Sequence, residues 1–131
     1  MSRIPVKASA YTDAFIGADG TVNTWSLIID QDGNTLSEEV APISSGKPTL
    51  RSARLDAVRL AMQSAFSSGI KDLELYLPDA SLAMELEHRR PVERSIMTHY
   101  LMVMAMRHAF RSATFKPGTM QTIGKLSLGL A

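Results

Sequence analysis

The fold of this chain depends first on the stretch "YTDAFIGADGTVNTWSLIIDQDGNTLSEEVAPI", which runs from Tyr11 to Ile43. The first segment, roughly residues 4–16, mixes β-branched, aromatic and small residues, and the segment 21–29 alternates apolar and polar residues as a strand does. "GADG" and "DQDGN" separate the segments, and the Asp32-Gly33 pair is a strong hairpin signal before a return strand over 35–43. The stretch therefore predicts three consecutive antiparallel strands.

The rest of the chain alternates helices and strands. A helix is predicted over 50–66, capped by Thr49 and ended by Gly69, because apolar residues recur there at helical spacing. A strand over 70–77, a short helix over 78–88, a helix from Pro91 to about Phe110, a strand over 112–117 and a weak last helix over 120–131 follow. We predict one α/β domain over 1–131, a mixed five-stranded sheet of three antiparallel strands and then strands joined by helices, flanked by α-helices. The apolar positions of the first helix are Leu55, Val58, Met62, Ala65 and Phe66.

Composition excludes several classes of protein. With 131 residues there is room for one core, and the absence of cysteine excludes disulfides and thiolate metal sites. The N-terminal residues lack an apolar signal-peptide core, and no apolar run approaches membrane-spanning length. We expect a cytoplasmic protein with no membrane contact, no cofactor and no bound metal.

Charge is distributed unevenly, although the formal net charge is only +1. Acidic residues are frequent in the first 40 residues, whereas no acidic residue follows Glu93. The segment "HRRPVER", His88 to Arg94, precedes this acid-free part. This asymmetry indicates either an anion-binding surface or a solvated face that meets acidic residues from the first half of the chain.

Several segments, taken in order, resemble the ribonuclease H family over nearly the whole chain. "YTDAF" is similar to the family's first-strand Y-T-D-G motif, with Ala14 in place of the glycine, and Trp25 stands where members often have Trp or Tyr. "PTLRSARLDAV" resembles the T-N-N-x-A-E start of the first helix, matched at Thr49 and Ala53. "GIKDLELYLPDASLA" resembles the segment that carries the family's third carboxylate, matched at Gly69, Ile70 and Asp79.

The resemblance implies cleavage of RNA in RNA/DNA hybrids by divalent metal ions that four carboxylates hold, because Mg²⁺ prefers several oxygen ligands. Asp13 matches the first carboxylate and Asp79 the third, whereas Arg54 stands at the second position and Lys125 at the fourth. The family's RNA-contacting Asn pair becomes Leu50 and Arg51. Two carboxylates beside cations are a poor magnesium site, so the resemblance implies an inactive member of the family.

Asp56 does not replace the missing glutamate, because two residues along a helix turn it roughly 200° away from Arg54. We interpret Asp13 and Asp79 as what remains of a metal site, with Asp13 held by Arg54, Lys125 or both. The alternative is that Asp13 only ends a strand and Asp79 only caps a helix.

"YLMVMAM", Tyr100 to Met106, is apolar on all sides of its predicted helix and rich in adaptable methionine. It is either a central helix covered by its neighbours or, over 92–110, a homodimer or partner interface. The interface would use Tyr100, Met102, Met104 and Met106.

We therefore expect a non-catalytic domain that binds nucleic acid (RNA, DNA or hybrid) through the cationic remainder of the family's cleft. The alternatives are a protein-interaction module that uses the methionine-rich helix and a divergent metal-dependent nuclease. The residues expected to contact nucleic acid are Arg51, Arg54, Lys125, Arg89, Arg90 and Arg94.

Overall fold

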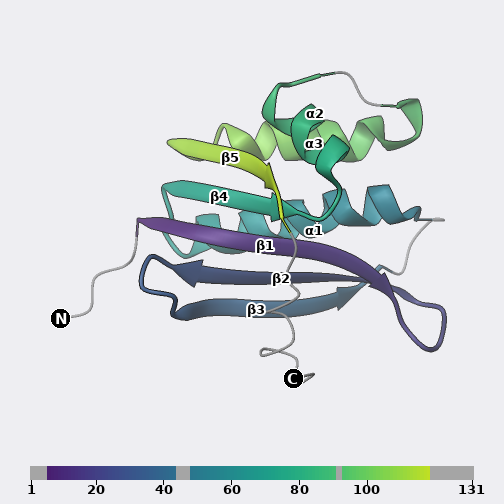
Figure 1. The fold of residues 1–131 in the computed structure, drawn as a ribbon, viewed down its shortest axis with the longest axis horizontal. Helices are drawn as coiled ribbons and strands as arrows, with labels where there is room; N and C mark the ends of the chain where they lie inside the picture. The colour runs from purple at the N-terminus through teal and green to yellow at the C-terminus, as the bar shows by residue number, and fades with distance from the viewer. Residues whose placement is uncertain (1–5, 44–47, 91–92, 119–131) are drawn as a thin grey trace.

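The computed structural model describes residues 6–43, 48–90 and 93–118. Its strands form one sheet in the order β3-β2-β1-β4-β5 (Figure 1). The first three strands, β1 (Lys7–Ile16), β2 (Val22–Asp30) and β3 (Thr35–Pro42), are antiparallel. β4 (Asp72–Leu77) pairs parallel to β1, and β5 (Ser112–Pro117) pairs parallel to β4. The predicted mixed five-stranded sheet is confirmed, including the short last strand.

The two predicted turns join the antiparallel strands. Gly20 and Gly33 both have positive φ angles, 83° and 85°, a conformation in which a residue with a Cβ is strained. In the second turn, the Asp30 carboxylate accepts hydrogen bonds from the backbone N–H groups of Asp32 and Asn34. These contacts stabilise the hairpin that the Asp-Gly pair predicts.

The described helices are α1 (Leu50–Ser67), α2 (Ala80–Glu87) and α3 (Met97–Arg107), with a 3₁₀ turn, η1 (Arg94–Ile96), before α3. Thr49 caps α1 through a reciprocal pair of hydrogen bonds with Ser52, and Gly69 follows the helix with a positive φ. The prediction of one helix from Pro91 to Phe110 is wrong in extent. After Arg107 the chain turns toward the sheet, where the backbone N–H of Arg111 donates to the Lys71 carbonyl beside the start of β4.

Two predicted features cannot be compared with the structure. Pro91 and the last predicted helix, 120–131, lie outside the described residues. Within the described ranges, no helix is long and apolar enough to cross a membrane.

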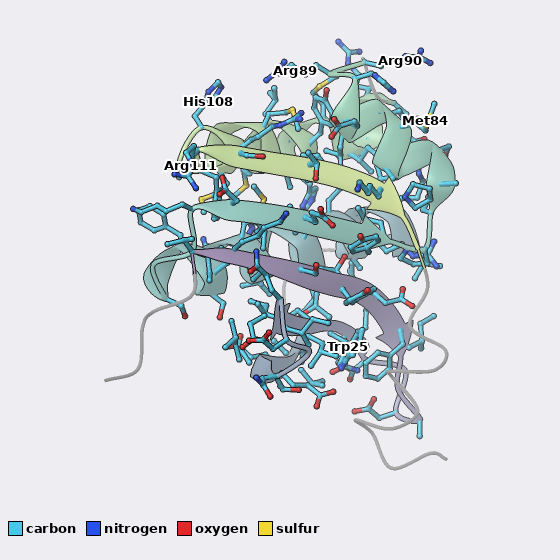
Figure 2. The ribbon with its side chains drawn as sticks, turned by 60° about the vertical axis from the view of Figure 1, so that its left-hand side comes forward. Trp25, Met84, Arg89, Arg90, His108 and Arg111 are labelled. Carbon is cyan, nitrogen blue, oxygen red and sulfur yellow. The ribbon has the colours of Figure 1, made fainter. Side chains whose placement is uncertain are left out.

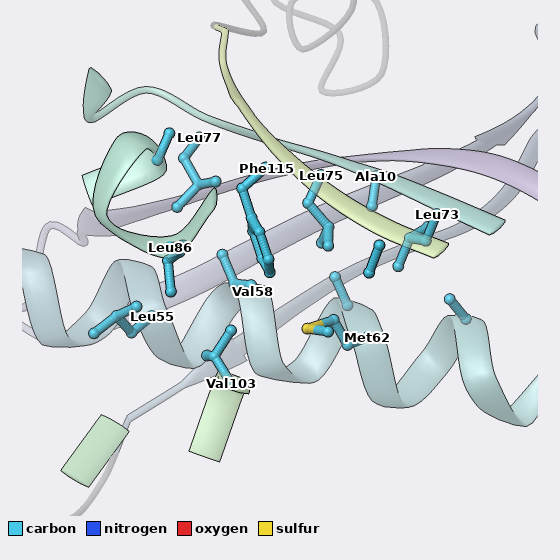
Figure 3. Packing of buried hydrophobic residues seen from close by; sticks show 14 of the residues in the cluster. Ala10, Leu55, Val58, Met62, Leu73, Leu75, Leu77, Leu86, Val103 and Phe115 are labelled. Carbon is cyan, nitrogen blue, oxygen red and sulfur yellow. The ribbon is translucent and has the colours of Figure 1, made fainter. Parts of the chain in front are cut away.

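All three helices contribute to one hydrophobic core on one face of the sheet (Figure 3). Leu73 and Leu75 of β4 point toward Val58 and Met62 of α1, and Phe115 of β5 extends the same cluster toward α2. Burial of these apolar side chains is the main stabilising contribution to the domain. Phe66 departs from its predicted core position: it is half exposed at the end of α1, where its ring and that of Phe110 are arranged edge to face.

The opposite face of the sheet carries a different set of side chains. Tyr11 of β1 and Tyr76 of β4 stack there with ring centroids 4.7 Å apart. These two residues are also the last pair in the register between β1 and β4. Asp13 on β1 and Asp79 after β4 therefore lie just beyond the point at which the two strands separate. That separation leaves room for side chains from the start of α1.

Candidate functional site

Asp79 is held in place by the helix that it caps. Its Oδ1 accepts hydrogen bonds from the backbone N–H of Leu82 at 3.0 Å and from the Ser81 hydroxyl at 2.9 Å. Capping satisfies backbone donors that have no partner inside the helix. The capping role considered for Asp79 is therefore present, and it leaves Oδ2 for other partners.

Arg54 lies between the two aspartates. Its Nε is 3.4 Å from Asp13 Oδ1, and its Nη1 is 4.0 Å from Asp79 Oδ2. The terminal Nη groups make no hydrogen bond within the described residues, and the side chain is about one-fifth exposed (22%). A guanidinium therefore stands where the family resemblance requires the second carboxylate, and it retains unused donors.

Arg51, one turn earlier on α1, has a much fuller set of partners. Its Nε donates to Asp79 Oδ2 at 3.2 Å, its Nη2 to Glu85 Oε2 at 3.1 Å, and its Nη1 to Glu93 Oε1 at 2.7 Å. Each nitrogen of the guanidinium thus meets a different carboxylate. Arg51 was expected to contact nucleic acid, and each of its three nitrogens already donates to a carboxylate.

The pKa shifts agree with these contacts. Burial by itself would raise the pKa of Asp79, but hydrogen bonds from Leu82, Ser81 and Arg51 together lower it below its ordinary value. Burial likewise opposes the charge of Arg51, but the Glu93, Glu85 and Asp79 carboxylates raise the pKa of Arg51 above its ordinary value. Both groups remain charged at neutral pH.

The described ionisable residues around Arg51 and Arg54 do not carry a net positive charge. Four carboxylates surround two guanidinium groups, so the cluster carries more negative than positive charge when all six groups are ionised. The cluster consists of Asp13, Arg51, Arg54, Asp79, Glu85 and Glu93. Lys125, the other cation expected here, lies outside the described residues.

The donor set does not fit the metal ions that the resemblance implies. Arg54 occupies the space between Asp13 and Asp79, and both cations of α1 would repel a divalent ion. Within residues 6–43, 48–90 and 93–118, no group of three or more Asp, Glu, His or Cys side chains is placed to hold a metal ion. No catalytic step through a metal is derived for this site.

Asp56 lies on another side of α1, as its position relative to Arg54 predicts. Its Oδ1 is 3.1 Å from His99 Nδ1 on α3 and 3.7 Å from Arg59 Nη2. These contacts connect α1 to α3. Asp56 is therefore paired with His99 and Arg59 and does not belong to the group around Asp13.

The unpaired arginines lie after α2. Arg89, Arg90 and Arg94 are exposed, and none forms an ion pair within the part of the chain that the structure describes. Figure 2 shows Arg89 and Arg90 projecting outward beyond the helices. Glu93, which contacts Arg51, directly precedes Arg94, so the start of η1 lies next to the cluster around Arg51. These three residues are called the arginine set below.

α3 exposes only part of its apolar surface. Of the residues expected at an interface, Tyr100 is buried, and Met104 and Met106 are partly buried and pack against the core. Met102 is exposed, together with Leu101, which was not selected from the sequence. The methionine-rich helix packs on α1 with one side and leaves Leu101 and Met102 exposed.

Two site residues were missed in the sequence analysis. Glu85 and Glu93 complete the environment of Arg51, but they are far from Arg51 along the chain. Glu93 was visible as the single acid within "HRRPVER". No local pattern indicates its partner.

Comparison with known proteins shows the fold. No family model matches the chain, and no curated protein matches it by sequence. Among solved structures, RNase H1 from the halophilic archaeon Halobacterium salinarum is similar with a TM-score of 0.78 and 18% identity, covering 95% of this chain and 99% of that chain. The N-terminal RNase H domain of rv2228c from Mycobacterium tuberculosis, solved as a fusion with maltose binding protein, has a TM-score of 0.78 and 15% identity, covering 89% of this chain and 85% of that chain.

A third similar structure is LC11-RNase H1 in complex with an RNA/DNA hybrid, with a TM-score of 0.73 and 19% identity, covering 85% of this chain and 84% of that chain. The class of fold is therefore that of ribonuclease H. Identity at this level shows the fold, and the function has to be argued from the site.

Proposed function

We propose that this protein is a non-catalytic domain of the ribonuclease H fold that binds nucleic acid through the arginine set. The observation that carries the proposal is that Arg89, Arg90 and Arg94 are exposed without ion-pair partners in the described ranges, and that Arg94 directly follows Glu93, which contacts Arg51. LC11-RNase H1, which has the same fold, was solved with an RNA/DNA hybrid. That structure supports a duplex of this kind as the first ligand to test.

Non-catalytic binding is proposed because Arg54 takes the place of a metal-binding carboxylate. Its Nη groups have no hydrogen-bond partner among the described residues, so Arg54 can contribute one phosphate contact at the edge of the surface. We do not assign this role to Arg51, because each of its three nitrogens already contacts a carboxylate. This division differs from the expectation that both residues contact phosphates.

The proposal has a quantitative consequence. Three to four phosphate contacts give a plot of log affinity against log salt with a slope of roughly −2 to −4, and micromolar or weaker affinity near physiological salt. Little sequence preference is expected, because the contacts go to the backbone and not to base edges.

The test is fluorescence anisotropy with a labelled RNA/DNA hybrid over a series of salt concentrations, with chelator present. The double variant Arg89→Gln/Arg90→Gln is expected to bind more weakly and with a shallower salt slope than the unmodified chain. Arg111→Gln is the matched control. Arg111, directly before β5, is also exposed, but it is paired with Asp72. Absence of binding by the unmodified chain to hybrid, duplex and single strands at low salt would overturn the proposal.

A second candidate function is protein interaction through α3. Leu101 and Met102 are exposed, with accessibilities of 57% and 44%. α3 itself contains no acidic residue. Its test is the oligomeric-state measurement in the Discussion.

A further inference from the structure

Arg51 connects three points of the segment that leads to the arginine set. Its partners are the residue that caps α2 (Asp79), a residue in the middle of α2 (Glu85) and the residue directly before η1 (Glu93). The contact with Glu93 spans 42 positions of the sequence. One side chain of α1 therefore holds both ends of the part of the chain that carries Arg89 and Arg90.

The turn after α2 needs such support. Arg89 has a φ of 53°, a left-handed conformation that glycine usually supplies at this position after a helix. The turn is closed by a hydrogen bond of 2.9 Å from the Arg90 N–H to the Glu85 carbonyl. Glu85 thus contacts Arg90 through its backbone and Arg51 through its side chain.

The contacts of Arg51 also differ from those expected of an arginine that binds phosphate directly. Asp79, Glu85 and Glu93 each take one of its nitrogens, and the same carboxylates repel an approaching phosphate. Lysine could not reproduce this arrangement, because an ammonium group lacks the planar, branched donors of a guanidinium. Arg54 on the same helix has unused donors and offers a comparison.

We infer that Arg51 is a positioning residue: it fixes the arginine set against α1 so that Arg89, Arg90 and Arg94 meet a nucleic-acid backbone together, without contacting that backbone itself. This inference rests on the proposed function. It adds a role that differs from that of Arg54, although the two residues lie one turn apart.

The experiment compares Arg51→Gln, Arg51→Lys and Arg54→Gln in the full chain, using the labelled RNA/DNA hybrid and the salt series described above. Arg51→Gln is expected to bind about tenfold more weakly. Without the Arg51 contacts, the segment that carries the arginine set has to be ordered when nucleic acid binds, and this ordering costs free energy. The salt slope of Arg51→Gln should equal that of the unmodified chain, because no phosphate contact is lost. Arg51→Lys should be almost as weak as Arg51→Gln, whereas Arg54→Gln should reduce the slope by about 0.7 to 0.9.

Hydrogen exchange provides an independent measurement. Amide exchange at His88–Arg90 and Arg94–Ile96 is expected to accelerate in Arg51→Gln, while the exchange of β2 and β4 remains unchanged and shows that the variant is folded. Glu93→Gln, which removes the negative charge of one partner of Arg51 and no cation, should accelerate exchange in the same places and weaken binding.

The outcomes distinguish this inference from the proposed function. If the unmodified chain binds no nucleic acid, the proposed function fails. If the unmodified chain binds and folded Arg51→Gln binds equally well, the positioning role is wrong. If Arg51→Gln lowers the salt slope by one contact and Arg51→Lys restores it, Arg51 is a phosphate contact, and the inference is overturned while the proposed function stands.

Discussion

Arg54 Nε lies 3.4 Å from Asp13 Oδ1, across a separation of 41 positions in the sequence. The contact pairs a carboxylate near the end of β1 with a guanidinium near the start of α1. Asp79 Oδ2 is 4.0 Å from the same guanidinium. In this arrangement the positive charge between the two carboxylates comes from the chain itself.

The first prediction concerns catalysis. The unmodified chain is expected to leave an RNA/DNA hybrid uncut in Mg²⁺ or Mn²⁺, because Arg54 stands where the resemblance to ribonuclease H puts a metal-binding carboxylate. Product formation is measured on denaturing gels, with Asp13→Asn as a control for contaminating nuclease. Cleavage that Asp13→Asn abolishes would overturn the non-catalytic assignment.

The second prediction concerns a metal site that one substitution should create. Arg54→Glu would place a third carboxylate beside Asp13 and Asp79, and three oxygen ligands attract a divalent ion. The melting temperature of this variant should fall without metal and rise when Mg²⁺ or Mn²⁺ is added. Arg54→Gln is the control, since it removes the cation without adding a ligand. An equal response of both variants to the metal would contradict the prediction.

The third prediction concerns acid stability. The pKa of Asp79 is lowered in the folded state, so its contribution to stability is present above the unfolded value near 3.8 and is lost as the pH falls through the folded value. Asp79→Asn, which can still cap α2, should cost about 1 kcal/mol at neutral pH and reduce the loss of stability in acid. Urea unfolding at several pH values measures the effect, with the exposed turn variant Asp32→Asn as control. A parallel pH profile for Asp79→Asn and the unmodified chain would show that the ionised carboxylate does not matter.

The fourth prediction concerns alkaline pH. Burial, followed by the hydrogen bond from the Tyr76 hydroxyl to Glu74, raises the pKa of Tyr76 to about 12 from an ordinary value of 10.0. Because the folded value is raised, the contribution of Tyr76 is complete below about pH 10 and decreases as the pH rises toward about 12. Tyr76→Phe should remove this decrease, whereas Tyr11→Phe should retain it. Denaturant midpoints across this pH range check the result, and identical alkaline profiles for the two variants would count against it.

The fifth prediction concerns association through α3. If Leu101 and Met102 form a homodimer contact, light scattering at micromolar concentration should give about twice the chain mass, and Leu101→Glu should give a monomer. Leu36→Glu, on the exposed strand β3, is the control for an apolar-to-acidic change elsewhere. A monomer at every concentration would leave α3 with its packing role alone.

Much of the fold could be predicted because its signals are local. Alternation over β2, the Asp32-Gly33 turn and the Thr49 cap each depend on residues close together in the chain. The candidate site was less predictable. The proximity of Asp13, Arg54 and Asp79 followed only from the family resemblance. The predicted extent of α3 was wrong for a different reason: an apolar run does not show where the chain turns back toward the sheet.

The sequence by itself determined the order of the strands and helices, the absence of cysteine chemistry, and the presence of arginine at a position where the resembling family has a carboxylate. The tertiary structure alone decided what each arginine does. Arg51 and Arg54 are equivalent in type and differ by one helical turn, but Arg51 meets Glu85 and Glu93 from distant parts of the chain and Arg54 does not. It likewise decided that Tyr100 is buried while Met102 is exposed. The physical reason is that ion pairing and burial depend on distances in space, and residues far apart in sequence become neighbours only when the sheet and helices pack.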